Sequence, residues 1–250
     1  MFDWGNTLLG VAYTQPLGAR WGGDSTRVMQ RLSVTGFNTT LDLGSGSLRF
    51  VNRLSDSRAW GEVTRWRGAH ETLVGYEFSG LRTRYDVTAA ASSDPILAVG
   101  QRPSAASLYV DHTVRTSRMV ARAGLRGETV TGTGWSGVSP RLSLKWFANP
   151  DRAFTLAVGS TTQWTPALRN EQAPVRIFDF WLTADRNTPV ARAWQGSFGG
   201  EQWLGRARFV RLEGWVKRYS QLPSSNLFND PDVQGDEFIV TTGESYGADL

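Results

Sequence analysis

The sequence predicts an all-β protein, an antiparallel up-and-down transmembrane β-barrel to which these residues contribute about 10 to 11 strands. Three observations support this prediction. Apolar and polar residues alternate along many segments, as in strands with one apolar and one polar face. Several of these segments are longer than the roughly five or six residues usual for a strand. Tight and long connections also alternate, as in barrels that have short turns at one end and long loops at the other.

The clearest segment is a hairpin at residues 139–166, turned at 149–152. Its apolar residues alternate with polar ones and share one face in both arms. They are Leu142, Leu144, Trp146, Phe154, Leu156 and Val158. The stretch from Phe154 to Trp164, extended and tilted by roughly 40°, rises about 25 Å. This is the height of the apolar band between the two aromatic girdles of an outer-membrane barrel.

The same alternation predicts strands on both sides of this hairpin. Six precede it, at 6–15, 26–43, 58–66, 72–85, 107–115 and 119–128. Two follow it, at 191–203 and 207–219, and residues 245–250 resemble the beginning of another. Together with the two arms of the hairpin, these make ten complete strands and one that has begun.

The connections between these strands alternate in length. Tight turns are expected at 67–70, 116–118, 149–152 and 204–206. Long connections, rich in Gly, Pro, Asn and Asp, are expected at 44–54, 88–104, 165–190 and 220–245. A propeller would instead repeat a motif of about 40 residues, and we find no such repeat.

Composition limits the alternatives. The 11 Trp, 12 Phe and 6 Tyr accompany a mean hydropathy of only −0.32, and no apolar run approaches the ~18 residues of a spanning helix. Without cysteine, the chain has neither disulfides nor thiolate metal ligands. The net charge is +4, but Lys and Arg are scattered singly and form no basic run. We therefore expect no nucleic-acid partner.

No catalytic or metal constellation can be assembled from the sequence. The two histidines, His70 in a tight turn and His112 on an apolar strand face, are far apart in sequence and have no spaced partners. No nucleophile motif, phosphate-binding loop or zinc motif is present. We expect no enzymatic activity, no catalytic residue, no cofactor and no bound metal.

The polar strand faces carry both signs of charge, and two interpretations remain open. The charges could form a passage or a surface that holds an internal plug, or they could pair with one another, which is the interpretation that we favour. The carboxylates are Glu62, Glu77, Asp111, Glu128, Glu201 and Glu213, and the bases are Arg58, Arg122, Arg126, Arg141, Lys145 and Arg211.

Aromatic residues in two of the long connections are candidate ligand contacts. They are Phe178, Phe180, Trp181 and Phe228. Aromatic side chains in outer loops commonly contact ligands, but they also pack loop against loop, and we favour loop packing.

Most of the chain from 107 to 250 resembles the β-barrel region of TonB-dependent outer-membrane receptors. The matching segments are SLYVD from Ser107, VARAGLR from Val120, SPRLSLK from Ser139 through NPD at Asn149, QWTP from Gln163 and GESYGADL from Gly243. The resemblance implies a 22-stranded barrel filled by an N-terminal plug. It also implies a place in the outer membrane of a Gram-negative-type cell, with lipid as a partner.

The same resemblance implies a function. A receptor of this family imports a ligand such as a siderophore, cobalamin or oligosaccharide, with energy passed through the plug from the TonB complex. We expect residues 1–250 to be a single partial barrel domain without signal peptide, plug or final strands. Two other functions remain open: a soluble all-β binding module, for instance for carbohydrate, and an outer-membrane assembly or autotransporter barrel.

Overall fold

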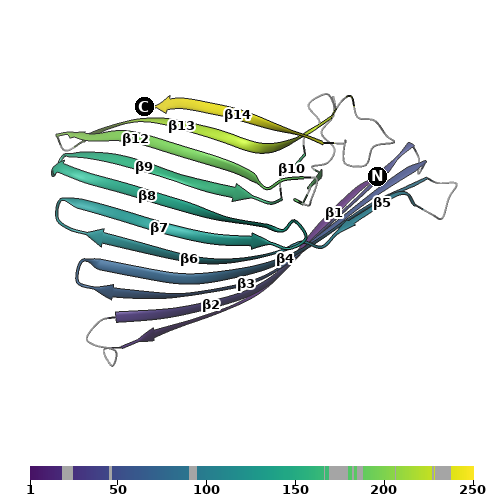
Figure 1. Cartoon of the computed structure of the whole chain (residues 1–250), viewed down its shortest axis with the longest axis horizontal. Helices are drawn as coiled ribbons and strands as arrows, with labels where there is room; N and C mark the ends of the chain where they lie inside the picture. The colour runs from purple at the N-terminus through teal and green to yellow at the C-terminus, as the bar shows by residue number, and fades with distance from the viewer. Residues whose placement is uncertain are drawn as a thin grey trace.

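The computed structural model describes a curved antiparallel sheet (Figure 1). The described residues are 1–18, 25–44, 47–89, 95–165, 167–168, 180–181, 183–184, 188–205, 207–226, 228 and 238–250. Within them, no helix is both long enough and apolar enough to span a membrane.

Eleven strands form the main path of the sheet, each paired antiparallel with its neighbours. They are β1 (Phe2–Leu17), β2 (Ser25–Leu43), β3 (Leu48–Arg67), β4 (His70–Ala89), β6 (Ser104–Arg115), β7 (Met119–Val130), β8 (Trp135–Asn149), β9 (Arg152–Gln163), β12 (Ala191–Leu204), β13 (Arg208–Ser225) and β14 (Phe238–Asp249). β5 (Pro95–Gln101) pairs with β4 beside this path. β10 (Ala167–Leu168) and β11 (Phe180–Trp181) form a separate two-stranded sheet. The predicted antiparallel, all-β architecture and its eleven strands in order are confirmed.

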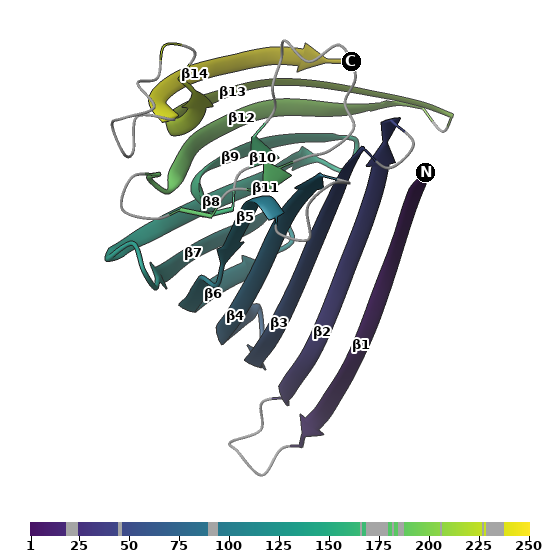
Figure 2. The ribbon, with the colours of Figure 1, turned by 90° about the vertical axis from the view of Figure 1, so that its right-hand side faces the viewer.

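The sheet is curled into an open trough, and its two faces differ in chemistry (Figure 2). Polar side chains are buried on one face, and large apolar ones are exposed on the other. Side chains converge on the inside of a curved sheet and diverge on its outside, so the crowded polar face is the concave one. The total exposed surface is 16878 Å², against about 11,000 Å² for a compact protein of this mass.

The apolar strand residues named from the sequence lie on the convex face. Leu142 and Leu212 are 49% and 56% exposed, and Val158 and Val210 are also exposed. Among the described residues, the buried apolar cluster contains only Ala105, Val130, Ala184 and Val190. This cluster is far too small to be the core of a soluble sandwich, because the apolar side chains of the strands do not meet in a closed interior.

Three of the predicted long connections are shorter in the structure, because strands occupy part of each predicted range. β3 already begins at Leu48, so 44–54 is not a loop but a short connection that includes Gly44 with φ +59°. The stretch 88–104 contains β5, which pairs with β4. Within 220–245, β13 continues to Ser225 and β14 begins at Phe238, with a register shift between Tyr219 and Leu222.

These strand extensions were missed for a physical reason. In these segments apolar residues do not alternate regularly with polar ones, as Phe50 followed by Val51 in β3 shows, so the period-2 signal disappears although the hydrogen-bond ladder continues. β3 and β4 each have 20 residues, about 66 Å of strand, which is more than a bilayer requires. Trp164 also differs from expectation: it follows the end of β9 and packs against the small apolar cluster.

The four predicted tight turns are confirmed and lie at one end of the sheet (Figure 1). They join β3 to β4, β6 to β7, β8 to β9 and β12 to β13. At the other end β4, β9 and β13 end and β5, β12 and β14 begin, and a short turn at 131–134 joins β7 to β8. Sequence-adjacent strands therefore run up and down across the same sheet, as predicted.

The turn between β3 and β4 gives a test of this fold. Gly68 has φ +55°, and Arg67 pairs directly with His70 across a two-residue loop. A side chain in this left-handed conformation costs about 1–2 kcal/mol. We expect Gly68→Ala to lower the free energy of unfolding by that amount in a denaturant titration.

Gly36→Ala is the matched control, because Gly36 has open space around its Cβ position and no positive φ. It should leave stability unchanged or raise it slightly. Equal effects of the two substitutions would contradict the assigned turn geometry.

Candidate functional site: the polar concave wall

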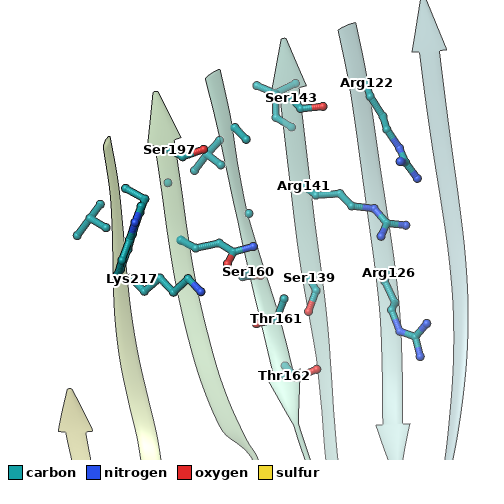
Figure 3. Close-up of a pocket in the computed structure, with 18 of the residues that line it drawn as sticks. Arg122, Arg126, Ser139, Arg141, Ser143, Ser160, Thr161, Thr162, Ser197 and Lys217 are labelled. Carbon is teal, nitrogen blue, oxygen red and sulfur yellow. The ribbon is translucent and has the colours of Figure 1, made fainter. Parts of the chain in front are cut away.

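A hollow of about 830 Å³ lies on the concave face, lined by strands β7, β8, β9, β12 and β13. Figure 3 shows its labelled side chains projecting from five neighbouring strands. They are Arg122 and Arg126 of β7, Ser139, Arg141 and Ser143 of β8, Ser160, Thr161 and Thr162 of β9, Ser197 of β12 and Lys217 of β13. On β7 and β8 these positions alternate with apolar or small ones, so the strand period itself brings the polar groups together. On β9, Ser160, Thr161 and Thr162 are consecutive, so alternation alone does not place all three on this face.

Asp111 of β6 holds two of these arginines. Its side chain is almost completely buried, at 4% exposure. Arg141 Nε donates a hydrogen bond to Asp111 Oδ1 at 2.9 Å, and Arg122 Nε donates to the same oxygen at 3.2 Å. Arg141 also bonds the second carboxylate oxygen through Nη2. One carboxylate therefore fixes two guanidinium groups from two neighbouring strands.

A second network connects β4, β7 and β9. Arg126 Nη2 donates to Glu77 Oε2 at 3.0 Å and to Glu128 Oε1 at 3.2 Å. Thr162 donates its hydroxyl hydrogen to the other oxygen of Glu128 at 2.8 Å. Arg58 approaches Glu77 at 3.2 Å, which extends the network to β3.

All twelve charged residues named from the sequence are in ion pairs. Besides those above, Lys145 contacts Glu201 at 2.7 Å, Arg211 contacts Glu213, and Glu62 lies 3.9 Å from Arg27. Mutual pairing, the favoured interpretation, is confirmed. The pairs compensate charge across a wide polar face. The exposed pairs contribute little to stability individually, whereas the buried Asp111 depends on its two arginines.

Six Lys and Arg side chains of this face make cation–π contacts with aromatic rings, and the sequence analysis did not predict these contacts. The cation–centroid distances lie between 5.2 and 5.8 Å. The pairs are Arg27–Trp66, Arg31–Trp60, Arg126–Tyr109, Lys145–Phe147, Arg192–Trp135 and Lys217–Trp215. In Lys145–Phe147 and Lys217–Trp215 the ring lies two residues away on the same strand, and in three other pairs it lies on a neighbouring strand. Arg192 of β12 reaches Trp135 of β8 across β9. The four pairs between strands could be found only once strand register was known.

Two glycines make room for these networks. A Cβ at Gly124 would lie 2.1 Å from Asp111 Oδ1 and 2.7 Å from Arg141 Nε. A Cβ at Gly75 would lie 2.4 Å from the ring of Tyr109. Gly75 and Gly124 are therefore strand positions where side chains from neighbouring strands crowd.

Of the four aromatic candidates for ligand contact, Phe228 is the one whose side chain the structure describes. Phe178 lies outside the described residues. Phe180 and Trp181 form β11, where their backbone pairs with Leu168 and Ala167. Phe228 is 93% exposed. Their role in binding stays a prediction, and Phe228, whose side chain is described, does not line the hollow of the concave wall.

The described residues contain no group of three or more metal-ligating side chains. The two histidines, distant in sequence, are neighbours in space, with ring centroids 5.4 Å apart. They lie on the convex face, because His112 alternates with the buried Asp111 and Thr113.

Comparison with known proteins identifies the fold. No protein-family model matches the chain, and no curated protein matches its sequence. The structure is similar to the siderophore receptor PirA from Pseudomonas aeruginosa, with a TM-score of 0.60 and 14% identity, over 98% of this chain and 46% of that one. It is similar to the alcaligin outer-membrane receptor FauA from Bordetella pertussis, with a TM-score of 0.63 and 12% identity, over 99% and 43%.

The RagAB peptide transporter has a TM-score of 0.63 and 11% identity, over 99% of this chain and 34% of that one. The chain thus has the fold of the barrels of TonB-dependent receptors, and it spans less than half the length of each of these structures.

The close approach at Gly124 leads to a second test. In Gly124→Ala the new methyl group must displace Asp111 or Arg141, so we expect a loss of about 1–3 kcal/mol in the free energy of unfolding. Gly127→Ala is the control on the same strand, because nothing lies within 4 Å of its Cβ position. A Gly124→Ala variant as stable as Gly127→Ala would show that the Asp111 network does not occupy this space.

Proposed function

We propose that this chain forms part of the barrel of a TonB-dependent receptor in the outer membrane of a Gram-negative-type cell. The proposal rests on the distribution of side chains, which is the reverse of that in a soluble protein. Apolar side chains lie on the exposed convex face, and charged ones lie on the concave face. Lipid requires an apolar exterior, and a water-filled or plugged interior requires a polar one. The likeness to receptor barrels over nearly the whole chain supports the same assignment.

The inverted side-chain distribution disfavours a soluble binding module. Such a module would expose the Leu142, Leu156 and Leu212 side chains to water over a large continuous surface, which soluble monomers rarely do. An assembly or autotransporter barrel would share the convex face. The length of the strands and the similarity to receptors favour the importer over these two barrels.

An internal plug would fill the space inside the polar concave face. A polar plug segment or water in the hollow of about 830 Å³ would bond the donors and acceptors that line it, such as Arg122, Gln195 and Lys217. Through this plug, the TonB complex would supply the energy for import.

The ligand class remains that of the sequence analysis: a siderophore, cobalamin or oligosaccharide. Four cations line the hollow, Arg122, Arg126, Arg141 and Lys217, against two carboxylates, Glu128 and Glu213. Because Asp111 pairs with Arg122 and Arg141, and Glu77 pairs with Arg126, the positive charge of the lining is offset and does not select an anionic ligand. Phe178, Phe180, Trp181 and Phe228 are proposed as contacts at the outer mouth.

A pair of substitutions on opposite faces tests the membrane assignment. Leu142→Arg places a charge on the lipid-facing side near mid-depth, where it should cost about 2–4 kcal/mol. Ala157→Arg, on the neighbouring strand but lining the concave hollow, should cost much less. The measurement is the free energy of unfolding of the chain reconstituted in phosphatidylcholine vesicles. Equal costs would refute lipid exposure of the convex face.

Sidedness can be tested with single cysteines, since the chain has none of its own. The tight turns would face the periplasm and the longer connections the cell exterior. A membrane-impermeant thiol reagent applied to intact cells should label Phe228→Cys but not Asp151→Cys, and both should be labelled after lysis. Labelling of Asp151→Cys alone in intact cells would reverse the topology.

A further inference from the structure

The two histidines of the chain meet on the convex face beside the turn between β3 and β4. His70 begins β4, and His112 lies on β6, the strand that pairs with β4. In this register His112 lies opposite Thr72, so the two imidazole rings are diagonal neighbours on one face. Both side chains are exposed and line a hollow of about 580 Å³. The pairing of β4 with β6 therefore creates an accessible pair of the side chain that most often binds metals in proteins.

One nitrogen of each ring faces the other ring. His70 Nδ1 lies 3.3 Å from His112 Nε2, and the ring centroids are 5.4 Å apart, so the rings meet edge to edge through these nitrogens. Two nitrogens bound at about 2.0–2.1 Å to one tetrahedral zinc ion are about 3.3 Å apart. Neighbouring ligands of a square-planar metal would be closer, at about 2.9 Å. The two histidines therefore have the spacing of two ligands of a tetrahedral zinc site.

Thr72 holds the second nitrogen of His112. Its Oγ1 lies 2.9 Å from His112 Nδ1. When Nδ1 donates its hydrogen to this hydroxyl oxygen, the lone pair of the ring is on Nε2, the nitrogen that faces His70. Histidines that bind a metal usually donate their other ring hydrogen to a second group in this way. The Thr72 contact therefore both orients the ring and selects the tautomer that a metal ligand requires.

We propose that His70 Nδ1 and His112 Nε2 bind a zinc ion, and that two water molecules complete its tetrahedral coordination. The hollow provides the space for these waters. Its described lining contains no carboxylate, so the site is weaker than a structural zinc site with four protein ligands. Arg67, which lines the same hollow, lowers the affinity further by repelling a dication. The proposal does not depend on the membrane assignment.

A bound zinc ion would join β4 to β6 near the tight turns. In the chain these two strands are separated by the segment that contains β5, so their pairing closes a longer loop than the pairing within a tight hairpin does. A metal that binds only when the two strands are paired stabilises the paired state. Zinc should therefore raise the temperature at which the sheet unfolds.

The test measures zinc affinity of the purified full chain, without a histidine tag, by competition with a chromophoric chelator. We expect His70→Ala and His112→Ala each to weaken binding by about 100-fold or more, since loss of an outer partner alone costs about 10- to 100-fold. Thr72→Val should weaken it by about 10-fold. Arg67→Gln should tighten it, because a repelling charge is removed. Arg31→Gln, which removes the same charge over a Trp ring of the concave face, should leave it unchanged.

Magnesium is the control ion, because it prefers oxygen ligands and should not displace zinc. Thermal unfolding gives a second measurement: zinc should raise the midpoint of the wild type but not that of His70→Ala/His112→Ala. Equal zinc affinity of the wild type and this double variant would overturn the proposal. Loss of affinity in only one of the two single variants would also overturn it, because the site requires both rings. Circular dichroism in the strand region checks that each variant is folded.

Discussion

The hydrogen-bond ladder of the sheet is the constraint on which the other features depend. In lipid, each backbone N–H and C=O must be bonded within the protein, and the strands from β2 to β13 meet this requirement along both edges. Once the backbone is satisfied in this way, side chains are free to follow the period of two. Apolar groups then point to the convex side and polar groups to the concave side, which reverses the burial seen in a soluble domain.

Because of this reversed burial, the crowded side chains of the sheet are those on its concave face. Charged side chains converge there, and Asp111 with Arg122 and Arg141 illustrates the solution: carboxylates are shared between guanidinium groups of different strands. Removing one partner of such a network would leave an uncompensated charge in a crowded wall. Glycines at 75 and 124 supply the space, so the network depends on residues that make no polar contact themselves.

The sequence predicted the strands within the apolar band, their order, the four tight turns and the pairing of all twelve charged residues. These features follow from alternation, which is local. Most missed features depend on partners far apart in sequence: β5 is recognisable only beside β4, and the four cation–ring pairs between strands only after register is fixed. His70 and His112 looked unrelated for the same reason, since only the β4–β6 pairing brings them together.

Along the main path, each strand pairs with the strands nearest to it in the chain, with only the short elements β5, β10 and β11 intervening. A hairpin is therefore a self-contained unit, and its insertion or duplication would require new partners only at its two flanking strands. No distant pairing would have to be rearranged, in contrast to sheets with crossover connections. A sheet with this connectivity can therefore gain or lose whole hairpins during evolution, which changes its circumference. The remaining strands keep their register.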